Sequence, residues 1–272
     1  MYLCDVHTHT RISPDSSAPL PDMVWAAQRA GLNELCVTDH CDLLDGWGAP
    51  VARFDWPAAL QQYHDAQKLA GDKLCLRLGL ELGSAPANPE AARAILAGAG
   101  DELDFVLGSL HNWIGEQGNI DLFFTEYNGD PGLCRRALEN CLDNSWFLVT
   151  RYSDCYDSLA HIVYPLRYMR RDGMDLSMAD YEERVRAIFT EVARTGHALE
   201  VNTYRGQDLD SWPQLLAWFR GCGGEFVTVG SDAHRPQDVA KGVRPALELL
   251  KAAGFTRLAV YEKRRPVLLP LE

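Results

Sequence analysis

Short apolar runs alternate along the chain with segments whose apolar residues recur at helical spacing. The runs predicted to be strands are Tyr2–Val6, Glu34–Thr38, Leu74–Glu81, Phe105–Ser109, Ser158–Ile162, Ala198–Asn202 and Phe226–Gly230. The segments predicted to be helices are Pro21–Ala30, Trp56–Ala70, Glu90–Ala99, Pro131–Asn144, Met178–Thr195, Ser211–Arg220 and Val239–Ala253. This alternation is typical of βα units, whose strands lie parallel in one sheet, and it predicts an α/β fold.

The composition fits one globular domain. The 272 residues show no internal repeat, low-complexity tract or linker, so we expect a single domain over residues 1–272. The formal net charge of −12 argues against nucleic-acid and membrane partners, because these bind basic surfaces. We therefore expect a small-molecule substrate, and an anionic one would need a local cationic site.

Cysteine usage and the amino-terminal segment indicate the compartment. The eight cysteines show no Cys-x-x-Cys pair and are expected to be free thiols in a reducing environment. The sequence shows no signal-peptide pattern and no run of about 18 apolar residues. We expect a cytoplasmic protein.

Histidine placement is the most informative feature. Six of the eight histidines occur at or just past the end of a predicted strand: His7, His9, His40, His111, His161 and His234. The carboxyl ends of parallel strands in a barrel meet at one rim, so six imidazoles gathered there indicate a common partner. His7 and His9 flank one residue of an extended segment, which sends both rings to the same face as a chelating pair.

Acidic residues share this rim: Asp15, Asp39, Glu81 and Asp232. Glu81 closes an apolar strand, where a carboxylate is costly to bury unless it is paired or bound to a cation. A salt bridge to an arginine is the alternative explanation. Imidazole nitrogens with carboxylate oxygens and no apparent thiolate suit Zn²⁺, Mn²⁺ or Fe²⁺ more than Ca²⁺.

In their order, these motifs resemble the PHP (polymerase and histidinol phosphatase) superfamily, in particular its stand-alone histidinol-phosphate phosphatases. The matching residues are Asp5-Val6-His7-Thr8-His9-Thr10 with Ser13 and Asp15, Thr38-Asp39-His40, Glu81, Gly108-Ser109-Leu110-His111, His161 and Ser231-Asp232-Ala233-His234. The resemblance extends from His7 to about Tyr261. It implies a distorted TIM-like (β/α)7 barrel with three divalent metal ions at the carboxyl ends of its strands.

The resemblance also implies which residues bind each ion. One metal would take His7, His9, Glu81 and Asp232, a second Glu81, His111 and His161, and a third Asp15, His40 and His234. Glu81 would bridge the first two ions.

This chain departs from the family pattern in three places. Some relatives have His where this chain has Asp15, and many have Asp where it has Val163. Tyr204-Arg205-Gly206 replaces the more usual small residue and glycine, which shifts the expected position of a phosphate-binding arginine.

The activity that the resemblance implies is hydrolysis of L-histidinol phosphate to L-histidinol and phosphate, a phosphoric monoester hydrolysis of histidine biosynthesis. The residues predicted to act in catalysis are Glu81, Asp232, His234 and Arg205. Those predicted to contact the substrate are Arg205, Arg167, Tyr204 and Trp113. Loop position adds Asp42 and Glu116 as candidates for binding the amine and imidazole of the substrate.

Three alternatives stay open at the level of sequence. The chain could be a PHP phosphoesterase that acts on another small phosphomonoester or on a nucleotide. An amidohydrolase-type barrel also uses a His-x-His pair and a late Asp, but its usual fourth-strand lysine is absent from Phe105–Ser109. A metal-binding regulatory protein with an inactive site is disfavoured, because no ligand position is missing.

Overall fold

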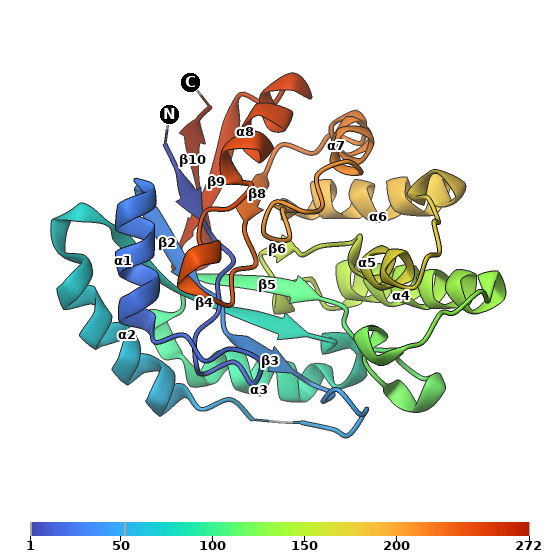
Figure 1. Cartoon of the computed structure of the whole chain (residues 1–272), viewed down its shortest axis with the longest axis horizontal. Helices are drawn as coiled ribbons and strands as arrows, with labels where there is room; N and C mark the ends of the chain where they lie inside the picture. The colour runs from blue at the N-terminus through green and yellow to red at the C-terminus, as the bar shows by residue number, and fades with distance from the viewer. Residues whose placement is uncertain (1, 52, 272) are drawn as a thin grey trace.

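The computed structural model describes residues 2–51 and 53–271, and its main sheet follows the order β1-β2-β4-β5-β6-β7-β8 with all neighbours parallel (Figure 1). The bounds of these strands are β1 Cys4–Asp5, β2 Glu34–Val37, β4 Cys75–Gly83, β5 Phe105–Ser109, β6 Ser158–Leu159, β7 Ala198–Asn202 and β8 Val227–Gly230. A short strand, β3 (His40–Asp42), continues β2 along β4, because Val37 pairs with Leu78 and His40 pairs with Glu81.

The sheet curves until its first and last strands meet. His9 N–H donates to the carbonyl of Ala233 at 2.8 Å, and Asp232 N–H donates to the carbonyl of His7 at 2.9 Å. These bonds join the segment after β1 directly to the segment after β8. The expected α/β barrel with seven parallel strands is therefore confirmed.

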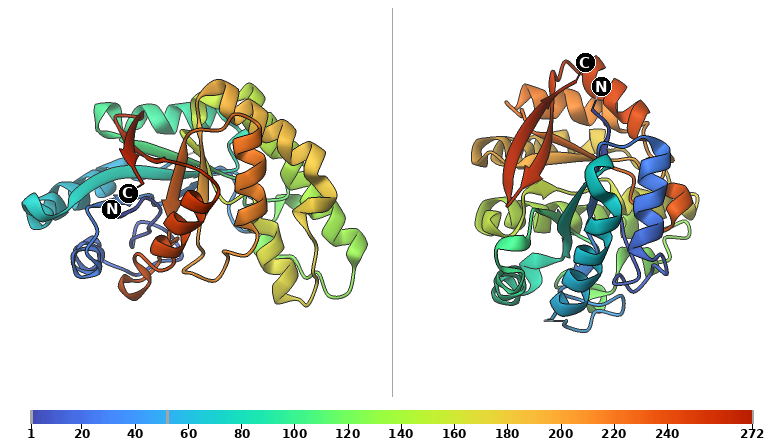
Figure 2. Two further views of the ribbon diagram at one scale, coloured as in Figure 1. Left: turned by 90° about the horizontal axis from the view of Figure 1, so that it is seen from above. Right: turned by 90° about the vertical axis from the view of Figure 1, so that its left-hand side faces the viewer.

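Helices cover the outside of the barrel (Figure 2). Their bounds are α1 Leu20–Ala30, α2 Trp56–Ala70, α3 Pro89–Gly98, α4 Pro131–Arg151, α5 Tyr164–Arg171, α6 Glu182–Thr195, α7 Trp212–Gly221 and α8 Val243–Ala252. Every residue of β5 and β7 is buried beneath them. Among the described ranges, no helix is long and apolar enough to cross a bilayer.

Local sequence fixes where three helices begin. Asp55, Asn88 and Asp130 each accept a hydrogen bond from the backbone N–H three residues later, at the first turn of α2, α3 and α4. A proline stands in the first turn of each of these helices, where its missing N–H costs nothing.

Helix α5 and a carboxyl-terminal hairpin, β9 (Arg257–Glu262) with β10 (Arg265–Pro270), are not expected from the sequence. The eight residues of α5 are too few to show a clear period. The hairpin turns at Lys263 and Arg264, whose φ values are 50° and 59°. Turns of this kind are usually marked in a sequence by an Asn-Gly or Asp-Gly pair, and this one has Lys-Arg instead.

Three helix boundaries also differ from expectation by four residues or more. Helix α6 begins at Glu182 instead of Met178, because Met178–Tyr181 form a 3₁₀ turn. Helix α4 runs on to Arg151 instead of ending at Asn144. Helix α8 begins at Val243 rather than Val239, because Ala240 and Gly242 take positive φ values of 65° and 76° that no α-helix accommodates.

The hairpin packs on the amino-terminal end of the barrel. Lys263 N–H donates to Asp104 Oδ1 at 3.0 Å, and the Tyr261 hydroxyl donates to the carbonyl of Asp157 at 3.1 Å. The guanidinium of Arg264 pairs with the Asp157 carboxylate at 3.0 Å. Asp104 and Asp157 precede β5 and β6, so the hairpin lies at the end opposite to the strands' carboxyl ends.

Two long loops meet at the carboxyl ends of the strands. The predicted loop Asn112–Gly132 contacts the loop after β3, since the Asn112 side chain donates to the carbonyl of Asp45 at 2.9 Å. Asp121 N–H donates to the carbonyl of Gly46 at 3.1 Å. Together these loops form one wall at this end of the barrel.

Gly230, the last residue of β8, allows β1 to close the barrel. A Cβ atom at this position would lie 2.2 Å from the Cβ of His7 and 2.7 Å from Glu200 Oε1. Real Cβ atoms do not approach so closely, and both neighbours are fully buried.

We predict that Gly230→Ala lowers the free energy of unfolding by about 2 kcal/mol or more, because overfilling a packed core forces backbone shifts. Urea unfolding followed by circular dichroism measures this loss. Gly221→Ala is the matched control. Gly221 is exposed at the end of α7, so alanine there should be neutral or slightly stabilising. Equal unfolding free energies for the two variants would contradict this role of Gly230.

Candidate metal centre

The nine side chains predicted to bind metal lie together at the carboxyl end of the barrel. They are His7, His9, Asp15, His40, Glu81, His111, His161, Asp232 and His234. They come from six parts of the barrel wall, after β1, in β3 and β4, and after β5, β6 and β8. The fold thus assembles residues that are up to 227 positions apart in sequence, from His7 to His234.

A first group of ligand atoms surrounds one point near the β1–β8 seam. His7 Nε2 lies 3.2 Å from Glu81 Oε2, and His9 Nε2 lies 3.5 Å from the same oxygen. Asp232 Oδ1 lies 3.8 Å from His7 Nε2 and 3.5 Å from His9 Nε2. Ligands about 2.0–2.1 Å from a tetrahedral ion lie about 3.3 Å apart, so these four atoms fit one ion.

A second group forms around the other oxygen of Glu81. Glu81 Oε1 lies 3.1 Å from His111 Nε2 and 2.7 Å from His161 Nε2. The Ser109 hydroxyl donates to this same oxygen at 2.6 Å. The two oxygens of one buried carboxylate thus face two separate groups of imidazoles.

The third group lies nearest to solvent. Asp15 Oδ2 is 2.9 Å from His234 Nε2 and 3.6 Å from His40 Nε2, and the two imidazole nitrogens are 3.4 Å apart. His40 also approaches Glu81, with 2.9 Å between its Nδ1 and Glu81 Oε2. The Asp15 side chain is 56% exposed, so this group faces outward.

Unpaired nitrogen atoms support metal binding at these positions. His9 Nε2 is buried without a hydrogen-bond partner in the described part of the chain. The ring of His9 lies between those of His40 and His234, with centroids 4.2 and 4.1 Å away. His9, His40 and His234 also form a possible three-nitrogen set, so the division of ligands among ions is not unique. A buried imidazole nitrogen without a partner is unfavourable, and a metal ion would satisfy it.

Burial and neighbouring charges shift the pKa values of these groups. Burial opposes the charge of Glu81, yet His40, His7 and His111 hold the pKa of its carboxyl well below the usual value. Burial, together with His234 and His40, holds the pKa of His9 well below its usual value. Neighbouring carboxylates raise the pKa values of His7, His40 and His111 in spite of their burial. A metal binds the ionised carboxylate and the neutral imidazole, so it would take the place of the protons on these three rings.

Carboxylates and a hydroxyl behind the imidazoles fix the ring orientations. His7 Nδ1 lies 2.6 Å from Glu200 Oε1, and His111 Nδ1 lies 2.6 Å from Asp42 Oδ1. His9 Nδ1 lies 3.1 Å from the Ser13 hydroxyl. Such partners select the tautomer that leaves the opposite nitrogen free for a metal.

Glycine makes one of these contacts possible. A Cβ atom at Gly83 would lie 1.8 Å from Asp42 Oδ1 and 3.0 Å from His111 Nδ1. The side chain of Asp42 therefore occupies the space that any other residue at position 83 would fill. Asp42 orients His111 and also lines the cleft described below, so its contact with substrate stays a prediction beside this role.

Glu200 is a functional residue that the sequence-based site prediction did not include. It is fully buried near the end of β7, and its Oε2 accepts the backbone N–H of His161 at 3.0 Å while Oε1 contacts His7. A carboxylate in the apolar strand Ala198–Asn202 is the same signal that identified Glu81.

Asp39 lies beside the centre but does not face it. Its carboxylate accepts bonds from the Thr10 N–H at 2.6 Å, the Thr10 hydroxyl at 2.7 Å and the Ser13 hydroxyl at 2.7 Å. Asp39 therefore holds the loop after β1, which carries Ser13 and Asp15.

The predicted substrate-binding residues have different environments. Arg167, from α5, is buried and pairs with Asp232 Oδ2 at 3.2 Å. Tyr204 and Arg205 follow β7 and line the cleft described below. Trp113 is fully buried, and its indole N–H donates to the Thr125 hydroxyl at 2.9 Å. The structure contradicts substrate contact by Trp113, because its ring is enclosed within the loop.

A cleft of about 750 Å³ opens onto the three groups. Arg205 and Arg235 line it, and neither pairs with a carboxylate within the ranges that the structure describes. At its mouth the rings of Trp47 and Phe124 stack at 4.6 Å. Asp121 also lines the cleft, whereas Glu116 is exposed and is not among the described residues that line it. The cleft thus combines a cationic side with an acidic and aromatic side.

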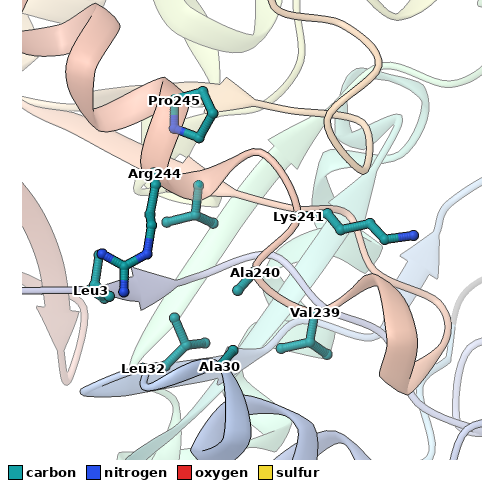
Figure 3. A pocket seen from close by; sticks show the side chains of 9 residues that line it. Leu3, Ala30, Leu32, Val239, Ala240, Lys241, Arg244 and Pro245 are labelled. Carbon is teal, nitrogen blue, oxygen red and sulfur yellow. The ribbon is translucent and has the colours of Figure 1, made fainter.

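A second cavity, of about 290 Å³, lies away from this centre (Figure 3). Leu3 and Leu32 line it from the beginnings of β1 and β2, and Val239 lines it from the segment before α8. No histidine or carboxylate occurs among the described residues around it, so it offers no side chain of the kind that binds metal in the main cleft.

The chain is similar to one family model and to several curated proteins. The model of the PHP domain matches residues 5–204. The histidinol-phosphatase of Lactococcus lactis is 28% identical over 268 residues, which cover 94% of this chain and 93% of that protein. The probable histidinol-phosphatase of Thermotoga maritima is 26% identical and covers 96% of this chain and 97% of its own length.

Solved structures give the same picture of the fold. A histidinol phosphate phosphatase from Lactococcus lactis, crystallised with zinc, L-histidinol and phosphate, aligns with a TM-score of 0.81 and 27% identity, over 97% of this chain and 98% of that one. A putative histidinol phosphatase from Listeria monocytogenes, at 19% identity, has a TM-score of 0.73 over 89% of this chain and 99% of its own.

We predict that Glu81→Gln and Glu81→Ala each lower kcat/KM for the hydrolysis of L-histidinol phosphate more than tenfold. This corresponds to a loss of at least about 1.4 kcal/mol of transition-state stabilisation. The cause is the loss of the charge that faces two groups of ligands. Steady-state kinetics and metal analysis of the purified variants measure the effect. His64→Ala is the control, because His64 pairs with Glu102 on the exposed side of α2. A Glu81→Ala variant with more than a tenth of wild-type kcat/KM would exclude a bridging role.

Proposed function

The chain belongs to the PHP domain family, and we propose that it is a metal-dependent phosphomonoesterase that hydrolyses L-histidinol phosphate to L-histidinol and phosphate. The observation that carries this proposal is the arrangement of Glu81, with two groups of imidazoles on its two oxygens at the base of a cleft. The curated relatives of nearly equal length, named histidinol-phosphatases, support the choice of substrate.

We propose three divalent ions per chain, with the ligand sets given above for the three groups. Their mutual distances of 2.7–3.8 Å support shared binding of ions, and the division among the three ions follows the family resemblance. The ligand types suit zinc, manganese or iron, and zinc is the ion in the Lactococcus lactis structure.

Divalent ions held in this way supply a nucleophile at neutral pH and neutralise the charge of the phosphoryl group. The chain's own residues prepare for this. Glu200, Asp42 and Ser13 fix the imidazoles of His7, His111 and His9 before substrate arrives. Arranging these groups in advance removes the cost of reorganising them during the reaction.

Arg167 and Arg205, two of the arginines that line the cleft, have separate tasks. Arg167 pairs with Asp232 and Asp208 and donates to Asn202, so it holds a ligand carboxylate in place. Arg205 has its Nε buried without a hydrogen-bond partner in the described residues. We assign contact with the phosphate to Arg205, because a guanidinium can bind two phosphate oxygens at once.

Acidic and aromatic residues of the cleft fit a cationic, ring-containing alcohol. Asp121 Oδ1 accepts the Phe123 N–H at 2.7 Å and the Tyr164 hydroxyl at 3.1 Å, which leaves Oδ2 for a ligand. Trp47 and Phe124 provide flat apolar surfaces nearby. An amine can pair with this carboxylate, and an imidazole can stack on these rings.

The remaining parts of the proposal concern the whole chain. Residues 1–272 would act as one catalytic domain that binds a small phosphorylated substrate. All eight cysteines are free thiols, six of them buried at 0–4% exposure, which supports a location in the reducing cytoplasm.

Metal removal provides the first test of this proposal. We expect elemental analysis of gently purified protein to give more than one ion per chain, approaching three. Treatment with a chelator should abolish activity, and adding Zn²⁺ or Mn²⁺ should restore it. Full activity with one ion or fewer, and no gain on adding metal, would exclude the three-ion centre.

Phosphate contact by Arg205 provides the second test. Arg205→Ala should keep its fold and metal content but lose about 2–4 kcal/mol of transition-state stabilisation, through both kcat and KM. Arg205→Lys should rescue only part of this, since an ammonium group cannot make the two-pronged contact. Wild-type kinetics for Arg205→Ala would show that Arg205 is a solvated loop residue.

The substrate itself is tested with a panel of phosphomonoesters. We expect the highest kcat/KM with L-histidinol phosphate, and nucleotides or sugar phosphates that match it would contradict the proposal. Asp121→Asn keeps the acceptor for Phe123 and Tyr164 but removes the charge. It should lower kcat/KM for L-histidinol phosphate about tenfold while changing that for p-nitrophenyl phosphate less than twofold. Glu116→Gln is the matched charge control on the same loop.

A further inference from the structure

The ring of Tyr204 contacts two guanidinium groups. The central carbon of Arg167 lies 4.3 Å from the ring centroid, and that of Arg205 also lies 4.3 Å from it. The two like charges are therefore no farther apart than twice this distance. Aromatic faces attract guanidinium cations, so the shared ring offsets part of the repulsion between Arg167 and Arg205.

The backbone at this position is strained. Tyr204 and Arg205 have φ values of 45° and 57°, in the left-handed region that side chains other than glycine rarely adopt. Gly206 continues the turn with a φ of 81°. Two non-glycine residues in succession keep this conformation only where the surroundings enforce it.

Hydrogen bonds hold the strained turn against the metal-binding end of the barrel. Tyr204 N–H donates to Asn202 Oδ1 at 2.8 Å, and Arg205 N–H donates to the carbonyl of Ser231 at 2.7 Å. Asn202 Oδ1 also accepts the guanidinium of Arg167 at 2.7 Å. The turn is thus fixed to Arg167 and to the residue before Asp232.

The two arginines differ in their other partners. The guanidinium of Arg167 is held by Asp232, Asp208 and Asn202. Arg205 has no carboxylate partner within residues 2–51 and 53–271, and its guanidinium contacts the Tyr204 ring. This ring is therefore the contact that keeps the guanidinium beside the cleft.

We propose that Tyr204 is a positioning residue that holds the Arg205 guanidinium in place for a phosphate oxygen, against the repulsion of Arg167. This inference rests on the proposed phosphatase function and adds a determinant of phosphate affinity to it. An arginine held in its binding geometry loses less conformational entropy when the anion arrives. A glycine at position 204 would adopt this backbone conformation without strain, but it would have no ring to hold the Arg205 guanidinium.

The experiment measures binding of inorganic phosphate to the metal-loaded full chain by isothermal titration calorimetry, beside competitive inhibition of hydrolysis. The variants are Tyr204→Phe, Tyr204→Leu, Tyr204→Gly, Arg205→Ala and the double variant Tyr204→Leu/Arg205→Ala. Gln117→Gly is the control for relief of strain, because Gln117 also has a positive φ of 48° and lies in an exposed turn.

We expect Tyr204→Leu and Tyr204→Gly to weaken phosphate binding about five- to tenfold and to raise KM more than they lower kcat. Tyr204→Phe, which keeps the ring, should restore binding to within about twofold. Tyr204→Gly should have a Tm equal to or above that of the wild type, as Gln117→Gly should, which separates strain from affinity. The double variant should bind phosphate no more weakly than Arg205→Ala, because both changes act through one guanidinium.

Wild-type phosphate affinity in Tyr204→Leu or Tyr204→Gly would overturn the positioning role, and so would independent, additive losses in the double variant. If Tyr204→Leu fails to fold, Tyr204→Gly still decides the question, since glycine suits this backbone. Phosphate binding needs no turnover. A chain that binds phosphate but leaves L-histidinol phosphate intact would therefore contradict the proposed function and leave the role of Tyr204 supported.

Discussion

The structure depends on one buried carboxylate. Glu81 is fully buried, and its two oxygens face the imidazoles of His7, His9 and His40 on one side and of His111 and His161 on the other. Burying a charge is costly unless partners compensate for it. The five rings that surround Glu81 come from four separate segments, so the barrel must close correctly before this charge is compensated. Folding and assembly of the site are one event.

A layer of polar residues behind the centre links its loops to each other. Asp5 accepts the N–H and hydroxyl of Ser231 at 2.8 and 2.6 Å, and thereby fixes the loop that carries Asp232 and His234. Asp39 does the same for the loop that carries Asp15. Neither carboxylate faces the proposed metals. Each converts a flexible connection into a fixed one, which explains why residues on loops can be placed to within ligand distances.

Two kinds of feature could be predicted from the sequence: elements whose apolar residues follow a regular period, and sites that bury a charged or polar residue at a cost in free energy. The parallel strands follow from their apolar runs, and the rim follows from histidines and carboxylates at strand ends. Features that depend on tertiary contacts could not. Helix α5 is too short to show a period, the turn at Lys263 uses side chains where glycine is usual, and loop position alone could not show that Trp113 points inward. Glu200, like Glu81, is a carboxylate within an apolar strand, so the same argument could have identified it from the sequence.

Gly83 and Gly230 have no side chain and no chemical role, yet each is bounded by atoms of the site. Position 83 is filled by Asp42 and His111, and position 230 by His7 and Glu200. A larger side chain at either position would displace a ligand or the carboxylate that orients it, even where every ligand is retained. The sequence requirements of this centre therefore include two positions whose residues never touch a metal.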